Sequence, residues 1–176
     1  MAYIRNTTVA LLISLAALSV SGEERLDAET LYVKAVNAFN AGHFAAAAQL
    51  LTEFTTRYAG EPQMTGVMAR VYYALGSAQY NVRNMEAALA AFDEHLRRDP
   101  QSKQRAEVLF RMAAAHQVLG DYSRAIETYV ALMREFPDFE QGADARFHIA
   151  VCHLAQEDYT NAIPALLWLR ANPRAR

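Results

Sequence analysis

The stretch Gly120-Asp121-Tyr122-Ser123-Arg124-Ala125-Ile126 follows one run of helical composition and opens the next. Glycine commonly ends a helix because it adopts left-handed backbone angles at little cost, and alanine is the strongest helix former. Similar phrases occur three more times, at Gly42-His43-Phe44 before Ala47, at Asn84-Met85 before Ala88 and at Asp158-Tyr159 before Ala162. This recurrence predicts a chain built from repeated helix–turn–helix units.

The four phrases align on one alanine each, with spacings of 41, 37 and 37 residues between Ala47, Ala88, Ala125 and Ala162. Each repeat has another small residue twelve positions before this alanine and a large apolar residue four positions after it. The small residues are Ala35, Gly76, Ala113 and Ala150, and the large ones are Leu51, Phe92, Tyr129 and Leu166. Small residues let two helices approach closely and large residues fill the space beside them, so the pattern predicts paired helices.

Prolines mark the ends of the units, because proline blocks continuation of the preceding helix. They are Pro62, Pro100, Pro137 and Pro173. Together with the turns they predict eight helices, at residues 25–41, 44–58, 63–81, 84–98, 102–118, 121–135, 139–155 and 158–171. Asp138 and Gln141 have the spacing of a helix-capping box. Pro164 predicts that the last helix begins late, near Asn161, or kinks there.

The composition favours a helical binding protein over an enzyme or a nucleic-acid-binding protein. Apolar residues make up 53% of the chain, and the formal net charge is −2. The basic residues form no block that would attract nucleic acid. The sequence contains no phosphate-binding glycine loop, no HExxH and no paired CxxC. We therefore expect no enzymatic activity and no cofactor.

The first 21 residues have the composition of a cleaved secretory signal. Arg5 supplies a positive charge, Val9 to Val20 form an apolar run, and Ser19 and Ser21 stand at the positions that signal peptidases accept. The run is about twelve residues, shorter than the roughly 20 that span a bilayer. We therefore favour cleavage over an uncleaved anchor. The only cysteine, Cys152, is too far along the chain to carry a lipoprotein's lipid. A periplasmic or secreted protein with no stable membrane anchor is expected.

The repeated phrases resemble the tetratricopeptide repeat, and Leu119-Gly120-Asp121-Tyr122, Ala125-Ile126, Tyr129 and Pro137 form the closest copy. The resemblance implies an all-α fold, an α-α superhelix (solenoid) of about four helical hairpins. The repeats fall at about residues 28–61, 69–100, 106–137 and 143–174 of a domain spanning 22–176. Long-spaced units like these resemble those of bacterial envelope proteins of the Tol-Pal cell-division coordinator or outer-membrane assembly lipoprotein type. The chain lacks the coiled coil of the first type and the lipid-bearing cysteine of the second.

The resemblance also implies a concave groove, lined by the first helix of each hairpin, that accepts a peptide or a partner protein. The corresponding residues are Tyr32, Val36, Phe39 and Asn40 in the first repeat and Tyr73, Ser77, Tyr80 and Asn81 in the second. They are Phe110, Ala114 and Gln117 in the third and Phe147, Val151 and Leu154 in the fourth. The alternative is that the aromatic residue that begins each set only packs within the repeat.

Histidine and cysteine residues cluster in the seventh predicted helix. His148 and Cys152 are four residues apart and share a helix face with metal-ligand spacing, with His153 beside them and His116 one repeat earlier. Equivalent positions in this type of repeat usually hold packing residues, so we favour packing over metal binding.

The last predicted helix carries the apolar run Ile163-Pro164-Ala165-Leu166-Leu167-Trp168-Leu169. One face should pack on helix 139–155 and another should stay open, whereas repeat arrays normally end in a polar cap. We therefore expect Leu167 and Trp168 to mediate self-association or to dock a following domain. The other interpretation is that the chain is the front part of a longer array or of a larger multidomain protein.

Overall fold

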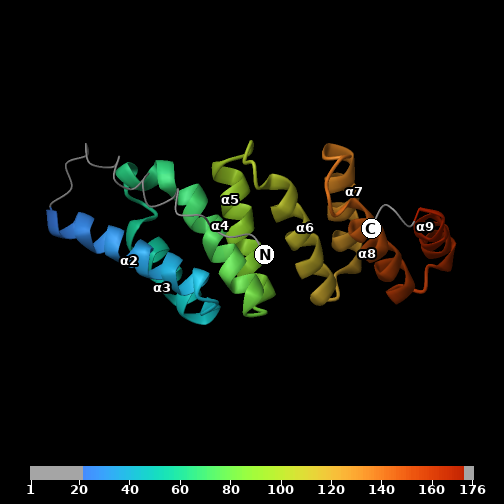
Figure 1. Cartoon of the computed structure of the whole chain (residues 1–176), viewed down its shortest axis with the longest axis horizontal. Helices are drawn as coiled ribbons and strands as arrows, with labels where there is room; N and C mark the ends of the chain where they lie inside the picture. Colours follow the sequence, from blue (N-terminus) through green and yellow to red (C-terminus); the bar gives the residue numbers. More distant parts are fainter. Residues whose placement is uncertain (1–21, 173–176) are drawn as a thin grey trace. The chain divides into compact units, whose positions relative to one another are not determined.

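The computed structural model describes residues 22–172, with side chains from Ala28 onward, and over this range it is all helical (Figure 1). The eight α-helices are α2 (Gly22–Asn40), α3 (Phe44–Tyr58), α4 (Thr65–Asn81), α5 (Met85–Arg98), α6 (Arg105–Val118), α7 (Tyr122–Glu135), α8 (Gly142–Ala155) and α9 (Tyr159–Ala171). A short 3-10 helix, η3 (Pro62–Met64), precedes α4. The predicted all-α class and the four helical hairpins are confirmed.

The chain divides into two compact units at Pro100 and Gln101. The first unit contains the hairpins α2–α3 and α4–α5, and the second contains α6–α7 and α8–α9. Within the first unit α3 also packs on α4, and within the second α7 packs on α8. None of the helices between residues 22 and 172 is both long and apolar enough to cross a membrane.

All four hairpin turns have the same hydrogen bonding. Gly42, Arg83, Gly120 and Glu157 have left-handed φ angles of 78°, 66°, 78° and 60°. In each turn the next N–H donates to the carbonyl five residues before it, at 2.8 to 3.0 Å, as in a Schellman motif. These bonds are His43 to Ala38, Asn84 to Gln79, Asp121 to His116 and Asp158 to His153. The repeated phrase therefore encodes the turn as well as the helices.

Capping side chains begin three of the four second helices. The carboxylate or amide oxygens of Asn84, Asp121 and Asp158 accept from the backbone N–H three residues later, at 3.4, 3.2 and 3.2 Å. Such caps satisfy donors that the first turn of a helix leaves unpaired. The first hairpin differs, since His43 makes no side-chain cap bond at the start of α3.

The core of the first unit depends on small residues at the helix crossings. Ala47 and Ala35 are fully buried, as are Ala88 and the backbone at Gly76. A Cβ atom added to Gly76 would lie 2.6 Å from the Phe92 ring, so only glycine allows α4 and α5 to approach this closely. The prediction that the aligned small residues lie between helices is confirmed.

The core of the second unit is built around Tyr129 and Leu132 of α7, which are fully buried. Ala113, Ala145 and Ile149 complete the cluster from α6 and α8. At the edge of the same unit, the guanidinium of Arg105 on α6 donates to the carboxylate of Glu135 on α7 at 2.6 Å. A partly exposed pair of this kind fixes the orientation of two helices more than it adds stability.

Two predicted helices begin three residues late. α6 begins at Arg105 and α8 at Gly142, where the sequence predicted starts at residues 102 and 139. The predicted capping box at Asp138 and Gln141 is wrong. Residues before α8 form a turn in which the Phe139 N–H donates to the Phe136 carbonyl. This turn lets Phe139 pack at the edge of the core instead of starting the helix.

Of the two predicted effects of Pro164, the late start near Asn161 is wrong, whereas the predicted range 158–171 is close to the observed helix. α9 begins at Tyr159, and Pro164 lies inside it. Asp158 caps the helix through Asn161, whose backbone N–H and side-chain amide both donate to the carboxylate. Pro164 removes a single backbone donor in the second turn, after the first-turn donors that have no intrahelical partner. The capping bonds are therefore sufficient to begin the helix before the proline.

Candidate binding face

The predicted groove residues of the first unit occupy equivalent faces of α2 and α4. Their spacing of four, seven and eight residues places each set on one side of its helix. The two sets are related by the 41-residue spacing of the first two repeats, so each residue of α2 has a counterpart on α4. The sets are Tyr32, Val36, Phe39 and Asn40 on α2, and Tyr73, Ser77, Tyr80 and Asn81 on α4.

The structure buries three of these residues. Tyr32 and Val36 belong to the core of the first unit, and Ser77 is also buried. The Tyr32 ring lies 6.0 Å from the Phe54 ring in an edge-to-face arrangement. Burial raises the pKa of Tyr32, and the positive charge of Arg70 partly opposes this increase. These three side chains pack within the unit and present no surface to a partner.

The remaining residues of the first unit reach the surface. Asn40 and Asn81 are exposed, and Phe39, Tyr73 and Tyr80 are half-buried. Phe39 is supported by Phe44, at a ring distance of 5.1 Å, and Tyr73 by His95, at 5.5 Å. The side-chain amide of Asn81 donates to the Ser77 carbonyl at 2.7 Å. The inner face of α2 and α4 therefore combines held aromatic rings with exposed amides.

In the second unit the predicted groove residues separate into a packing residue and a surface set. Phe110 lies between Tyr129, Phe139 and His148, at ring distances of 5.5, 6.0 and 6.0 Å. Gln117, Ala114 and Val151 are half-buried, whereas Phe147 and Leu154 are 48% and 39% exposed. Phe110 therefore supports the core, and Phe147 with Leu154 gives α8 an apolar surface.

The histidines and cysteine of α8 are held by aromatic packing and burial. His148 stacks on Tyr129 with ring centroids 5.6 Å apart and planes 6° from parallel. Burial lowers the pKa of His148 and raises that of the fully buried Cys152 to about 11. His153 Nδ1 lies 3.1 Å from the Asp158 carboxylate. No group of three His, Cys, Asp or Glu residues between 28 and 172 is arranged to hold a metal ion.

α9 packs on α8 through one side and exposes apolar residues on another, as the sequence predicted. Ala162 and Leu169 are buried, whereas Tyr159, Ile163 and Leu167 are 57%, 53% and 47% exposed. Consecutive helical residues point about 100° apart, so Trp168 does not share the direction of Leu167. The guanidinium of Arg146 on α8 instead lies 4.4 Å from the centre of the Trp168 ring. Both predicted interface residues are exposed, Leu167 at 47% and Trp168 at 39%, but they point in different directions.

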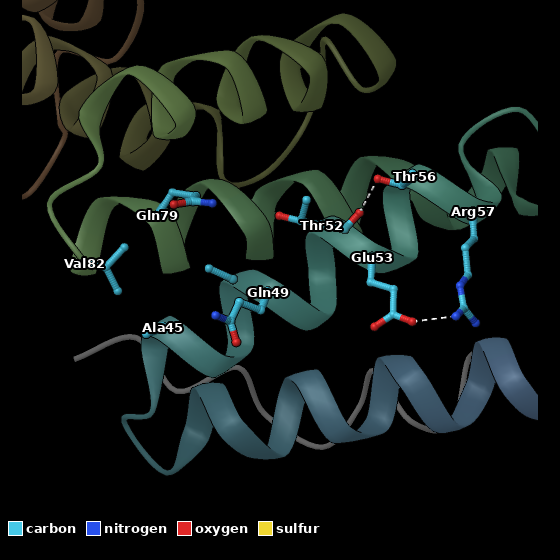
Figure 2. Close-up of a pocket in the computed structure, with 9 residues that line it drawn as sticks. Ala45, Gln49, Thr52, Glu53, Thr56, Arg57, Gln79 and Val82 are labelled. Carbon is cyan, nitrogen blue, oxygen red and sulfur yellow. Dashed lines mark hydrogen bonds and ion pairs between the residues drawn. The ribbon is translucent and has the colours of Figure 1, made fainter.

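A second hollow in the first unit was not predicted. It has a volume of about 570 Å³ and lies between α3 and the end of α4 (Figure 2). Figure 2 shows the lining residues Thr52, Thr56, Glu53 and Arg57 on α3, with Glu53 and Arg57 forming an ion pair, and Gln79 and Val82 at the end of α4. The signal for it was present: Ala45, Ala48 and Thr52 put small side chains three or four residues apart on one helix face.

A comparison with protein families decides the classification. The model of the tetratricopeptide repeat matches residues 32–103 and 110–175, which is most of the chain. The chain belongs to the tetratricopeptide repeat family. The family's fold suggests a scaffold for protein–protein interaction, and its members are generally not catalytic. The sequence has no match among curated proteins.

Solved structures with the same fold share little sequence with this repeat protein. The crystal structure of MamA MSR-1 has a TM-score of 0.70 and 16% identity, over 94% of this chain and 87% of that chain. MamA AMB-1 has a TM-score of 0.69 and 14% identity, over 94% and 82% of the two chains. The apo form of RapI has a TM-score of 0.64 and 14% identity, over 94% of this chain and 48% of RapI. These similarities establish the tetratricopeptide-repeat solenoid fold alone.

Proposed function

We propose that this tetratricopeptide repeat protein is a non-catalytic scaffold of the bacterial cell envelope that binds an extended peptide segment of a partner protein. The observation that carries the proposal is the surface of Phe39, Asn40, Tyr73, Tyr80 and Asn81 on the inner helices of the first unit. It combines apolar anchors with side chains that can hydrogen bond a peptide backbone.

The physical basis is the rigidity of the aromatic rings. Phe39 and Tyr73 are each held by a neighbouring ring, so they lose little conformational freedom when a ligand covers them. Aromatic residues dominate binding energy at protein interfaces because each buries a large area with few rotatable bonds. An exposed asparagine both donates and accepts, which matches the alternating groups of an extended backbone.

The envelope location is supported by the sequence of residues 1–21, which lie outside the described residues. Their positive start, short apolar run and small residues at the predicted cleavage site have the pattern of a secretory signal. The likeness of the long-spaced repeats to envelope proteins of the Tol-Pal coordinator type supports the same compartment.

The test replaces Asn40, Tyr80 and Asn81 together by alanine. These residues are exposed or half-buried, so the change removes three of the five side chains of the surface, including both amides, while Tyr32, Val36 and Ser77 keep the core. Purified wild type and variant are used to capture proteins from an extract of the source cells, quantified by mass spectrometry. We expect at least one partner captured by the wild type to fall by about tenfold or more with the variant.

The matched control places alanine at Gln49, Thr52 and Thr56, which line the hollow between α3 and the end of α4 in the same unit. Circular dichroism and the melting temperature establish that both variants are folded. If every partner is retained by the groove variant and lost by the control, the hollow is the binding site and the groove proposal fails. Equal retention by both variants also contradicts it.

A further inference from the structure

On α9 (red in Figure 1), residues are exposed whose equivalents on α7, in the preceding repeat, are covered by another helix. Ile163 and Leu166 stand 37 residues after Ile126 and Tyr129 of α7. Tyr129 is fully buried and Ile126 packs against the same core, beneath α8. In contrast, Ile163 is 53% exposed and Leu166 is half-buried. Among the described residues no helix covers α9 as α8 covers α7.

The exposed residues form one surface, which we call the α9 face: Tyr159, Ile163, Leu166 and Leu167. Together they span an arc of about 100° around the helix, and Trp168 lies outside it. None of the four is charged, and all are large. A contiguous exposed apolar surface of this kind commonly marks an interaction site.

The first helix cannot cover this face in a head-to-tail assembly. Within each unit the covering helix presents apolar residues, namely Val71, Leu75 and Ala78 on α4 and Ala145, Ile149 and Cys152 on α8, and all six are buried. The equivalent residues of α2 are Thr30, Lys34 and Asn37, and all three are exposed. A head-to-tail contact would bury a lysine against Ile163 and Leu166 with no compensating charge.

We propose that the α9 face binds the α9 face of a second copy of this chain, with the two helices antiparallel across a two-fold axis. In this arrangement the apolar residues of the two copies cover each other, as an isologous interface requires. The ends of α9 also match in charge. Glu157 and Asp158 stand at its beginning and Arg170 in its last turn, so each copy places Arg170 beside the acidic end of the other.

The antiparallel direction has two further supports. Neither Glu157 nor Arg170 makes an ion pair within residues 28–172. Antiparallel helices also place the positive N-terminal end of one helix dipole beside the negative end of the other. A parallel pair would bring Arg170 next to Arg170 and Asp158 next to Asp158, which is unfavourable.

The first test is the mass in solution of the full chain by analytical ultracentrifugation. We expect a dimer at protein concentrations of about 1 to 100 µM. Ile163→Glu and Leu167→Glu each place a charge in the α9 face and should raise the dissociation constant by about tenfold or more. Val130→Glu is the matched control. Val130 lies on α7, 37 residues before Leu167, and the two side chains are almost equally exposed, at 48% and 47%. Because Val130 lies outside the α9 face, the substitution should leave the dimer intact.

The second test determines the direction of the helices by disulfide formation. In the antiparallel arrangement residue 163 of one copy faces residue 167 of the other, so a mixture of Ile163→Cys and Leu167→Cys proteins should cross-link. Each protein alone should cross-link far less, and the wild type, whose Cys152 is buried, should not. This readout does not depend on the glutamate variants remaining folded.

Several outcomes would overturn the proposal. If the wild-type protein is monomeric over the whole concentration range, the dimer does not exist. If it is monomeric and co-purifies with a different protein bound to α9, that protein and not a second copy occupies the α9 face. A control variant as defective as Leu167→Glu would place the interface elsewhere. Cross-linking of Ile163→Cys protein with itself alone would show parallel helices.

Discussion

His148 is held at the centre of the second unit, with its ring parallel to that of Tyr129 and near those of Phe110 and Phe147. Burial lowers the pKa of His148 below its usual 6.5, and the negative charge of Asp144 opposes this only in part. In the unfolded chain the same histidine titrates at the usual value. As the pH falls, the unfolded state therefore takes up this proton first.

We predict that the folded chain loses stability as the pH falls below about 6.5, and that His148→Phe reduces this loss. When folding lowers the pKa of a histidine, stability falls as the pH drops from the unfolded pKa to the folded pKa. Below both pKa values the loss of stability stays constant. The phenylalanine keeps the ring stack but cannot be protonated. Urea unfolding of both proteins at about pH 7.5 and about pH 5.5 measures the difference. An identical loss in both would show that His148 is not responsible.

The aromatic residue that begins each predicted groove set is exposed to a different degree in each repeat. Tyr32 is buried, Tyr73 and Phe110 are half-buried, and Phe147 is 48% exposed. The spacing of residues in a sequence gives the direction in which a side chain points from its helix, but exposure depends on what the neighbouring helices cover. For this reason the sequence predicted which residues share the inner faces, but not which of them reach the surface.

At the scale of single helices, Gly76 sets the distance between α4 and α5. A Cβ atom there would lie 2.6 Å from the Phe92 ring, which is itself fully buried and has no room to move. We predict that Gly76→Ala destabilises the chain by about 1 to 3 kcal/mol through overpacking. The higher helix propensity of alanine offsets roughly 1 kcal/mol of the overpacking cost.

The control for this prediction is Gly66→Ala in the first turn of the same helix. No atom lies within 4 Å of the added Cβ at Gly66. This substitution should be neutral or stabilising by up to about 1 kcal/mol, because only the helix propensity changes. Thermal and urea unfolding measure both variants. If Gly76→Ala is as stable as Gly66→Ala, close helix approach does not depend on glycine.

The hairpin turns provide a second prediction at this scale. Arg83 has a φ angle of 66°, in a region where the turns of the first and third hairpins have glycine. A left-handed conformation costs a residue with a side chain roughly 1 to 2 kcal/mol, and glycine avoids this but loses more entropy on folding. We expect Arg83→Gly to stabilise the chain by about 0.5 to 1 kcal/mol. Gly120→Ala should destabilise it by a similar amount, and a loss of stability in Arg83→Gly would contradict the explanation.

Helix boundaries were predictable where turn chemistry repeats and failed where tertiary packing decides. The four left-handed turns and the caps at Asn84, Asp121 and Asp158 follow from local residues, and the helices beside them are placed to within one or two residues. Before α8 the local pattern at Asp138 suggested a cap. The Phe139 ring instead packs near the Phe110 ring, at a centroid distance of 6.0 Å, at the edge of the core. Such long-range competition is not visible in a local spacing.

For the whole chain, the N-terminal segment predicts processing on export. We expect the protein expressed with its own first 21 residues in a bacterial host to be found in the periplasmic fraction, beginning at Gly22. Mass spectrometry of the intact protein measures this. A charge in the apolar run, as in Leu15→Arg, should leave the precursor uncleaved inside the cell. Recovery of the unprocessed wild type from the cytoplasm would rule out the proposed compartment.

Trp168 is the only tryptophan in the chain, and its ring lies under the guanidinium of Arg146. Its fluorescence therefore comes from one known place, the seam between α8 and α9. When the last hairpin opens, the ring, which is 39% exposed in the folded chain, loses the cation and becomes fully exposed to water, and its emission should shift to longer wavelength. Circular dichroism, in contrast, follows all the helices at once. Comparing the two signals during unfolding would reveal, with no label attached, whether this end of the protein opens before the rest.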